Sequence, residues 1–172
     1  MDVLRVIAAA VLSPRGLLLV SKRAAPAVFY LPGGKPEPGE EAPSCLRREL
    51  REELGVEIAA ATPFARVHAP AALEGVMMDM SVFLTSLRGI PSPAAEISQL
   101  AWWPERSDVE LAPAVRDVVI PRLIAAGHLT PGSGVTVRRV PAGSTVQLRA
   151  EVLRPGKGVG AVARPDDDHP DT

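Results

Sequence analysis

Residues 34–56 read GKPEPGEEAPSCLRRELREELGV, a turn rich in glycine and proline that leads into a charged segment. The spacing of apolar residues in this segment predicts a helix that begins near Ala42 or Pro43 and ends at Gly55. One face of the helix is apolar, because a leucine recurs at every fourth position: Leu46, Leu50 and Leu54. Another face is acidic, because three carboxylates are spaced i, i+3 and i+4: Glu49, Glu52 and Glu53.

The acidic face needs positive charge to offset its repulsion. Like charges one turn apart destabilise a helix by ~0.2–0.5 kcal/mol per pair. Arg48 lies four residues before Glu52 and offsets part of this repulsion. A hard divalent cation with oxygen ligands offsets the rest most naturally, and Mg²⁺ commonly binds between carboxylates and substrate phosphates. For RELREELG alone, a solvated helix with a Glu/Arg face explains the pattern equally well.

The wider stretch resembles the signature of the Nudix hydrolases, G-x5-E-x7-R-E-U-x-E-E-x-G-U, in which U is aliphatic. Every defined position of the signature is matched: Gly34, Glu40, Arg48, Glu49, Leu50, Glu52, Glu53, Gly55 and Val56. The resemblance implies the Nudix fold, an α/β/α sandwich with a mixed β-sheet between helices. It also implies hydrolysis of a nucleoside diphosphate that is linked to another group, X.

The resemblance also implies roles for individual residues. Glu49, Glu52 and Glu53 would be catalytic and would bind Mg²⁺ or Mn²⁺, and which of them acts as general base stays open. Arg48 would be catalytic by orienting a glutamate through a charge-assisted hydrogen bond. Glu40 would contact the metal or support the turn.

Further candidates lie inside and outside the signature. Gly34 would hold the loop whose backbone amides approach phosphate. Glu96 precedes a predicted strand that ends in tryptophan, which resembles a loop glutamate that completes the metal site in many family members. A solvated loop carboxylate is the alternative for Glu96. Several basic residues lie near the expected phosphate side in sequence order: Arg5, Arg15, Lys22, Arg23 and Lys35. From this set we select Arg23 and Lys35 as candidate phosphate contacts.

The signature does not specify the substrate. The small size of the domain and the Pro-Gly-Gly-Lys sequence resemble MutT-like enzymes that act on (deoxy)nucleoside triphosphates, oxidised ones included. ADP-ribose or another NDP-sugar is the alternative substrate. A different class, a Nudix domain that binds a nucleotide without hydrolysing it, also stays open.

Hydrophobic patterning predicts the remaining elements. Alternation or apolar runs predict strands at 3–12, 17–21, 56–68 and 75–87, with a loop at 22–28. Another predicted strand follows Glu96 and ends at Trp102 and Trp103. Residues 111–126 fit a helix that ends at Gly127, and Pro121 should kink it or shift its register. We expect a Nudix domain over residues 1–129, a β-hairpin over 130–153 and a disordered tail over 154–172. The hairpin could extend the sheet, cover the site or pair with another subunit, so a homodimer stays open.

Composition limits the classes of partner. A chain of 172 residues suits one domain, and its formal charge of −1 gives no general attraction for nucleic acid or an anionic membrane. The single cysteine, Cys45, excludes an intramolecular disulfide and a cysteine-based zinc cluster. The longest early apolar run is too short to span a membrane and lacks the pattern of a signal peptide, so we expect a cytoplasmic protein.

Overall fold

The structure is a computed structural model that describes residues 3–71 and 75–131. The predicted tail and all but the first two residues of the predicted hairpin lie outside these ranges. The elements in chain order are β1 (Leu4–Ser13), β2 (Gly16–Lys22), β3 (Ala25–Tyr30), β4 (Gly33–Gly34), α1 (Ala42–Leu54), β5 (Glu57–Pro70), β6 (Met77–Arg88), β7 (Ile97–Pro104), β8 (Glu110–Leu111), the π-helical turn η1 (Val115–Val119) and α2 (Ile120–Ala125).

Among the described residues, the eight strands form one mixed sheet with the order β5-β6-β1-β2-β3-β8, in which β4 also pairs with β1 and β7 with β2. β1 runs parallel to β6, and β3 runs parallel to β8. The other pairs are antiparallel, including the predicted β1–β2 hairpin. The predicted mixed sheet is thus confirmed.

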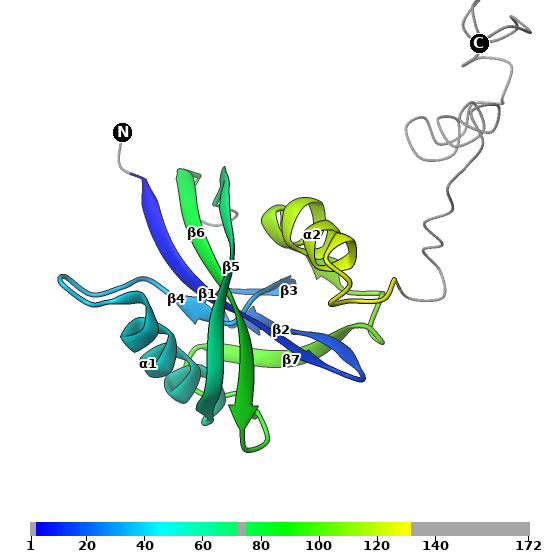
Figure 1. The fold of residues 1–172 in the computed structure, drawn as a ribbon, viewed down its shortest axis with the longest axis horizontal. Coiled ribbons are helices and arrows are strands. Elements are labelled where there is room, and N and C mark those ends of the chain that lie inside the picture. Colours follow the sequence, from blue (N-terminus) through cyan, green and yellow to red (C-terminus); the bar gives the residue numbers. More distant parts are fainter. Residues whose placement is uncertain (1–2, 72–74, 132–172) are drawn as a thin grey trace, which may run out of the picture. The chain divides into compact units, whose positions relative to one another are not determined.

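Strand β1 shows why helices cover both faces of the sheet. Its side chains alternate between two separate hydrophobic cores. One set packs with the buried face of α1: Ile7, Ala9 and Val11. The other set packs with the residues of η1 and α2: Ala8 and Ala10. Figure 1 shows α1 and α2 on opposite sides of the strands, which confirms the predicted α/β/α sandwich.

Helix α1 is held on the sheet by the predicted leucine stripe. Leu46, Leu50 and Leu54 are all fully buried. Burying a leucine side chain contributes about 1.5–3 kcal/mol relative to leaving it exposed. The helix ends as predicted, because Gly55 adopts the left-handed conformation with φ of 65° and donates its N–H to the carbonyl of Arg51. This docking fixes which side chains of α1 face the sheet.

Two local predictions were wrong. Part of the predicted loop at 22–28 belongs to strand β3, which forms because β2 and β8 both supply backbone partners for it. The last helical region begins at residue 113 rather than 111, because Leu111 is paired in β8. The predicted shift in helical register near Pro121 is confirmed, since the π-helical turn η1 ends at Val119, two residues before this proline. Within residues 3–71 and 75–131, no helix has the length and hydrophobicity needed to cross a membrane.

Candidate active site

Glu53 is a carboxylate at the interface between α1 and the sheet, and it is only 1% exposed. Its Oε2 atom accepts a hydrogen bond of 2.8 Å from the backbone N–H of Gly33. Its Oε1 atom is buried and accepts no hydrogen bond. Burial raises the pKa of Glu53 to about 7, although the Gly33 N–H and the charge of Lys22 act in the opposite direction. Glu53 therefore has a buried oxygen with spare capacity to bind a cation.

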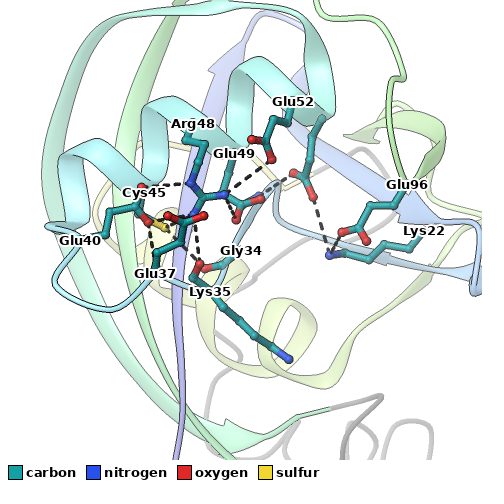
Figure 2. A network of polar contacts seen from close by, with 12 residues as sticks. Lys22, Gly34, Lys35, Glu37, Glu40, Cys45, Arg48, Glu49, Glu52 and Glu96 are labelled. Atoms are coloured by element: carbon teal, nitrogen blue, oxygen red, sulfur yellow. Dashed lines mark hydrogen bonds and ion pairs between the residues drawn. The ribbon is translucent and has the colours of Figure 1, made fainter.

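Arg48 forms the centre of a second group of contacts, which Figure 2 shows. Its Nε and Nη2 atoms donate to the two carboxylate oxygens of Glu40, at 3.0 and 2.8 Å. Its Nη1 atom donates to Glu49 at 2.9 Å and lies 3.6 Å from Glu52. Arg48 thus holds Glu49 in place and joins α1 to the loop that carries Glu40.

Glu40 is itself anchored to the loop. Its Oε2 atom accepts a hydrogen bond of 2.9 Å from the backbone N–H of Glu37. The pKa of Glu40 is lowered to about 2, mainly by the hydrogen bonds from Arg48 and further by the hydrogen bond from the Glu37 N–H. The same hydrogen bonds raise the pKa of Arg48. Glu40 therefore stays ionised and supports the turn before α1.

The three carboxylates of the acidic face differ in their surroundings. Glu53 is buried, Glu49 is half-buried against Arg48, and the side chain of Glu52 is 56% exposed. Within the part of the chain that the structure describes, no three histidine, cysteine, aspartate or glutamate side chains converge on one point as a metal cluster. The carboxylates are instead separated, with Arg48 beside Glu49 and Lys22 beside Glu53.

Glu96, the candidate from outside the signature, lies beside this group. Its Oε1 atom accepts a hydrogen bond of 2.5 Å from Lys22 Nζ (Figure 2). The same Nζ atom lies 3.7 Å from Glu53 Oε1. Burial lowers the pKa of Lys22, but the hydrogen bond from Lys22 to Glu96 and the nearby negative charges outweigh it, so the pKa is raised overall. The structure therefore brings Glu96 next to Glu53 through Lys22.

Two small residues bring the β4 backbone against these carboxylates. Gly33 donates its N–H to Glu53, and Gly34 lies against the carboxylate of Glu49. Cys45 packs beneath the same loop, and its burial, followed by the charges of Glu40 and Glu49, raises its pKa to about 11. The thiol therefore stays protonated near neutral pH, which agrees with a packing role.

A cavity of about 400 Å³ opens beside the carboxylates. Its polar lining includes Lys22, Lys35, Glu49 and Glu96. Its apolar lining comes from β1, β6 and the segment before η1: Leu4, Val6, Ala8, Met78, Met80, Ala112, Pro113 and Ala114. Such a combination of apolar walls and a few polar groups is typical of a site for a small molecule.

The two predicted phosphate contacts differ in position. Lys35 lines the cavity, whereas Arg23 is exposed and does not contribute to its lining. Lys22, the residue before Arg23, lines the cavity in its place. The alternation of the sequence did not show which of Lys22 and Arg23 faces the cavity, because the pairing register of β2 shifts between Ser21 and Lys22.

Comparison with known proteins identifies the family to which this chain belongs. A family model for the NUDIX domain matches residues 2–123, so the chain belongs to the NUDIX domain family and is a pyrophosphohydrolase of that family. Among curated proteins, no sequence matches this chain significantly.

Solved structures share the fold. A MutT NUDIX hydrolase from Burkholderia pseudomallei is 24% identical, with a TM-score of 0.57 over 71% of this chain and 97% of that chain. A NUDIX hydrolase from Nitrosomonas europaea is 20% identical, with a TM-score of 0.60 over 80% of this chain and 98% of that chain. A UDP-X diphosphatase is 20% identical, with a TM-score of 0.60 over 74% of this chain and 65% of that chain. At sequence identities of 20–24%, these similarities show a shared fold.

Proposed function

We propose that this chain hydrolyses a pyrophosphate linkage in a nucleoside diphosphate derivative with the help of Mg²⁺ or Mn²⁺. The substrate that we propose is a (deoxy)nucleoside triphosphate, oxidised ones included, which reacts with water to give a nucleoside monophosphate and pyrophosphate. The observation that carries this proposal is the buried Oε1 atom of Glu53, which accepts no hydrogen bond. This atom lies 3.7 Å from Lys22 Nζ, and the other oxygen of Glu53 accepts from Gly33. Both Lys22 and Gly33 line the cavity.

The proposed metal ligands are Glu49, Glu52, Glu53 and Glu96. Carboxylate oxygens suit Mg²⁺ and Mn²⁺, and a buried carboxylate with an unused oxygen is costly unless a cation compensates it. The residues present therefore fit such an ion. When bound, the ion supplies positive charge to the diphosphate and lowers the pKa of a water molecule.

The chain's own residues would prepare this chemistry. Arg48 positions Glu49 through a charge-assisted hydrogen bond and holds the loop through Glu40. One of the signature glutamates would accept the proton of the attacking water. Lys35 and the backbone of Gly34, which both line the cavity, would face the phosphates. Arg23 is also proposed as a phosphate contact, but its support is weaker than that of Lys35 because Arg23 does not line the cavity.

The apolar wall of the cavity supports a nucleotide whose base enters it. Met78 and Met80 of β6 and Leu4 of β1 form an adaptable surface against which a flat ring can pack. The triphosphate would then extend toward Lys35, Glu49 and Glu96, which also line the cavity. This arrangement would bring the linkage to be cleaved next to the proposed metal ligands.

A neighbouring groove favours a second candidate function, the hydrolysis of ADP-ribose or another NDP-sugar. The groove shares Leu4 and Lys35 with the cavity and adds Arg5 and Glu37. A substrate with two organic groups on one diphosphate could place one group in each space. A non-catalytic nucleotide sensor is a third candidate, and the complete set of signature carboxylates argues against it.

The experiment that separates these candidates is a substrate panel with Mg²⁺, Mn²⁺ or EDTA. The panel contains nucleoside triphosphates, oxidised deoxynucleoside triphosphates, ADP-ribose and NDP-sugars. Turnover of triphosphates that EDTA abolishes would support the proposal, and turnover of ADP-ribose or NDP-sugars alone would establish the second candidate. Nucleotide binding without turnover of any compound would identify a sensor.

The Glu52→Gln variant tests the site itself. We expect kcat to fall by on the order of 10³ or more while the fold survives, because an electrostatic element of the transition state is removed. Glu57→Gln is the matched control, since the Glu57 side chain is 54% exposed and that of Glu52 is 56% exposed. Unchanged turnover in Glu52→Gln would refute the assignment of Glu52 as a metal ligand.

A further inference from the structure

Lys22 is a cation that the protein places between two of the proposed metal ligands. It is the last residue of β2, and its side chain is 24% exposed. Its Nζ atom lies 2.5 Å from Glu96 Oε1 and 3.7 Å from Glu53 Oε1. Glu53 comes from α1, whereas Glu96 comes from the loop before β7. The ammonium group thus contacts both carboxylates in the structure.

The position of Lys22 conflicts with metal binding at the same two carboxylates. A divalent cation held by both Glu53 and Glu96 would compete with the ammonium group for the same two carboxylates. The two positive charges would repel each other strongly at such short range in a partly buried site. Binding of the cation would therefore favour movement of Lys22 away from this position. Its long, flexible side chain allows this movement without a change in the backbone.

The cavity supplies the next position for the displaced ammonium group. Lys22 lines it together with Lys35, Gly34 and Glu49, on the side where we propose that phosphates bind. A diphosphate bound there would offer the ammonium group anionic partners in place of the carboxylates. Arg23, by contrast, is exposed and does not line the cavity.

We infer that Lys22 is an exchangeable counter-cation that pairs with Glu53 and Glu96 in the metal-free protein and with the substrate diphosphate once a divalent cation has bound. This inference rests on the proposed function. Its consequence is that Lys22 opposes metal binding in the absence of substrate and favours substrate binding in the presence of metal. Lys22 thereby couples the two binding events, and such coupling is reciprocal.

The test uses the full chain and its Lys22→Met variant, with Mn²⁺ alone and then with inorganic pyrophosphate as the probe. Electron paramagnetic resonance measures Mn²⁺ binding to the free protein, and calorimetry measures pyrophosphate binding at saturating Mn²⁺. We expect Lys22→Met to tighten Mn²⁺ binding about tenfold and to weaken pyrophosphate binding about tenfold, which lies within the usual range of coupling between two sites. Lys22→Arg should retain pyrophosphate binding because it keeps the charge.

Arg47→Met is the control, because Arg47 is exposed on α1 and its loss changes the net charge by the same amount. Equal Mn²⁺ affinity in Lys22→Met and Arg47→Met, or weaker Mn²⁺ binding in Lys22→Met, would overturn the inference. Loss of pyrophosphate binding in Arg23→Met but not in Lys22→Met would also overturn it. If the wild-type chain binds neither Mn²⁺ nor pyrophosphate, the proposed function itself fails, and the inference fails with it.

Discussion

Gly34 and the carboxylate of Glu49 lie so close together that a Cβ atom on Gly34 would overlap the carboxylate carbon and both oxygens of Glu49. The backbone of Gly34 does not adopt the left-handed conformation that favours glycine. Glycine is therefore needed here for space alone. The signature glycine and the signature glutamate, fifteen positions apart in the sequence, form one packing unit in the structure.

Gly34→Ala should therefore impair the site and leave the fold intact. The added methyl group can be accommodated if the end of the Glu49 side chain moves, so the cost in stability is small. The moved carboxylate is then misplaced for metal binding, and we expect kcat to fall on the order of 10²-fold, since small misplacements have effects of this size. Steady-state kinetics and thermal unfolding of the same preparation measure both effects.

Gly127→Ala is the matched control for this variant. Gly127 has φ of 76° and open space around its Cβ position, so alanine there is strained without any clash. We expect a loss of about 1 kcal/mol in the free energy of unfolding with normal turnover. Full activity in Gly34→Ala would contradict the view that this glycine positions Glu49.

Arg48→Lys tests whether the shape of the guanidinium group, and not only its charge, organises the site. Arg48 donates to both oxygens of Glu40 and to Glu49 at the same time, which an ammonium group cannot reproduce. We expect kcat/KM to fall about 10- to 100-fold, the range found when groups that orient metal ligands are changed. The exposed neighbour Arg47 provides the control, and Arg47→Lys should behave like the wild type. Equal kinetics in the two variants would show that charge alone suffices.

The sequence predicted the elements whose patterns are local. The leucine stripe of α1, its start near Ala42 and its end at Gly55 all depend on residues within a few turns of one another. The mixed sheet followed from the resemblance. Strand β3 was missed because Pro26 and the neighbouring alanines hide its alternation, and because one of its two partners, β8, lies far along the chain.

The environment of each site residue could not be predicted from spacing. Glu49, Glu52 and Glu53 share a helical face by their spacing, but the way that α1 docks on the sheet buries Glu53 and exposes Glu52. The choice between Lys22 and Arg23 depends on an irregularity in β2 that has no signal in the sequence. Such differences arise from tertiary packing.

The buried carboxylate of Glu53 should make the stability of the metal-free protein depend on pH. Burial raises the pKa of Glu53 from 4.5 to about 7, so the folded protein holds this proton more tightly than the unfolded chain does. The stabilising effect of the bound proton is complete below pH 4.5 and is lost as the pH rises to about 7. The difference amounts to about 3 kcal/mol at most, since one unit of pKa corresponds to about 1.4 kcal/mol.

Denaturant unfolding in EDTA between pH 5 and pH 8 measures this effect. The wild type should lose stability over this range relative to Glu53→Gln, which keeps an acceptor for the Gly33 N–H but does not titrate. Glu57→Gln should follow the wild type, because Glu57 is exposed. Mg²⁺ should restore the stability of the wild type at pH 8 and have little effect on Glu53→Gln, because the metal compensates the same buried charge. Parallel pH profiles for the wild type and Glu53→Gln would show that this carboxylate is already compensated within the protein.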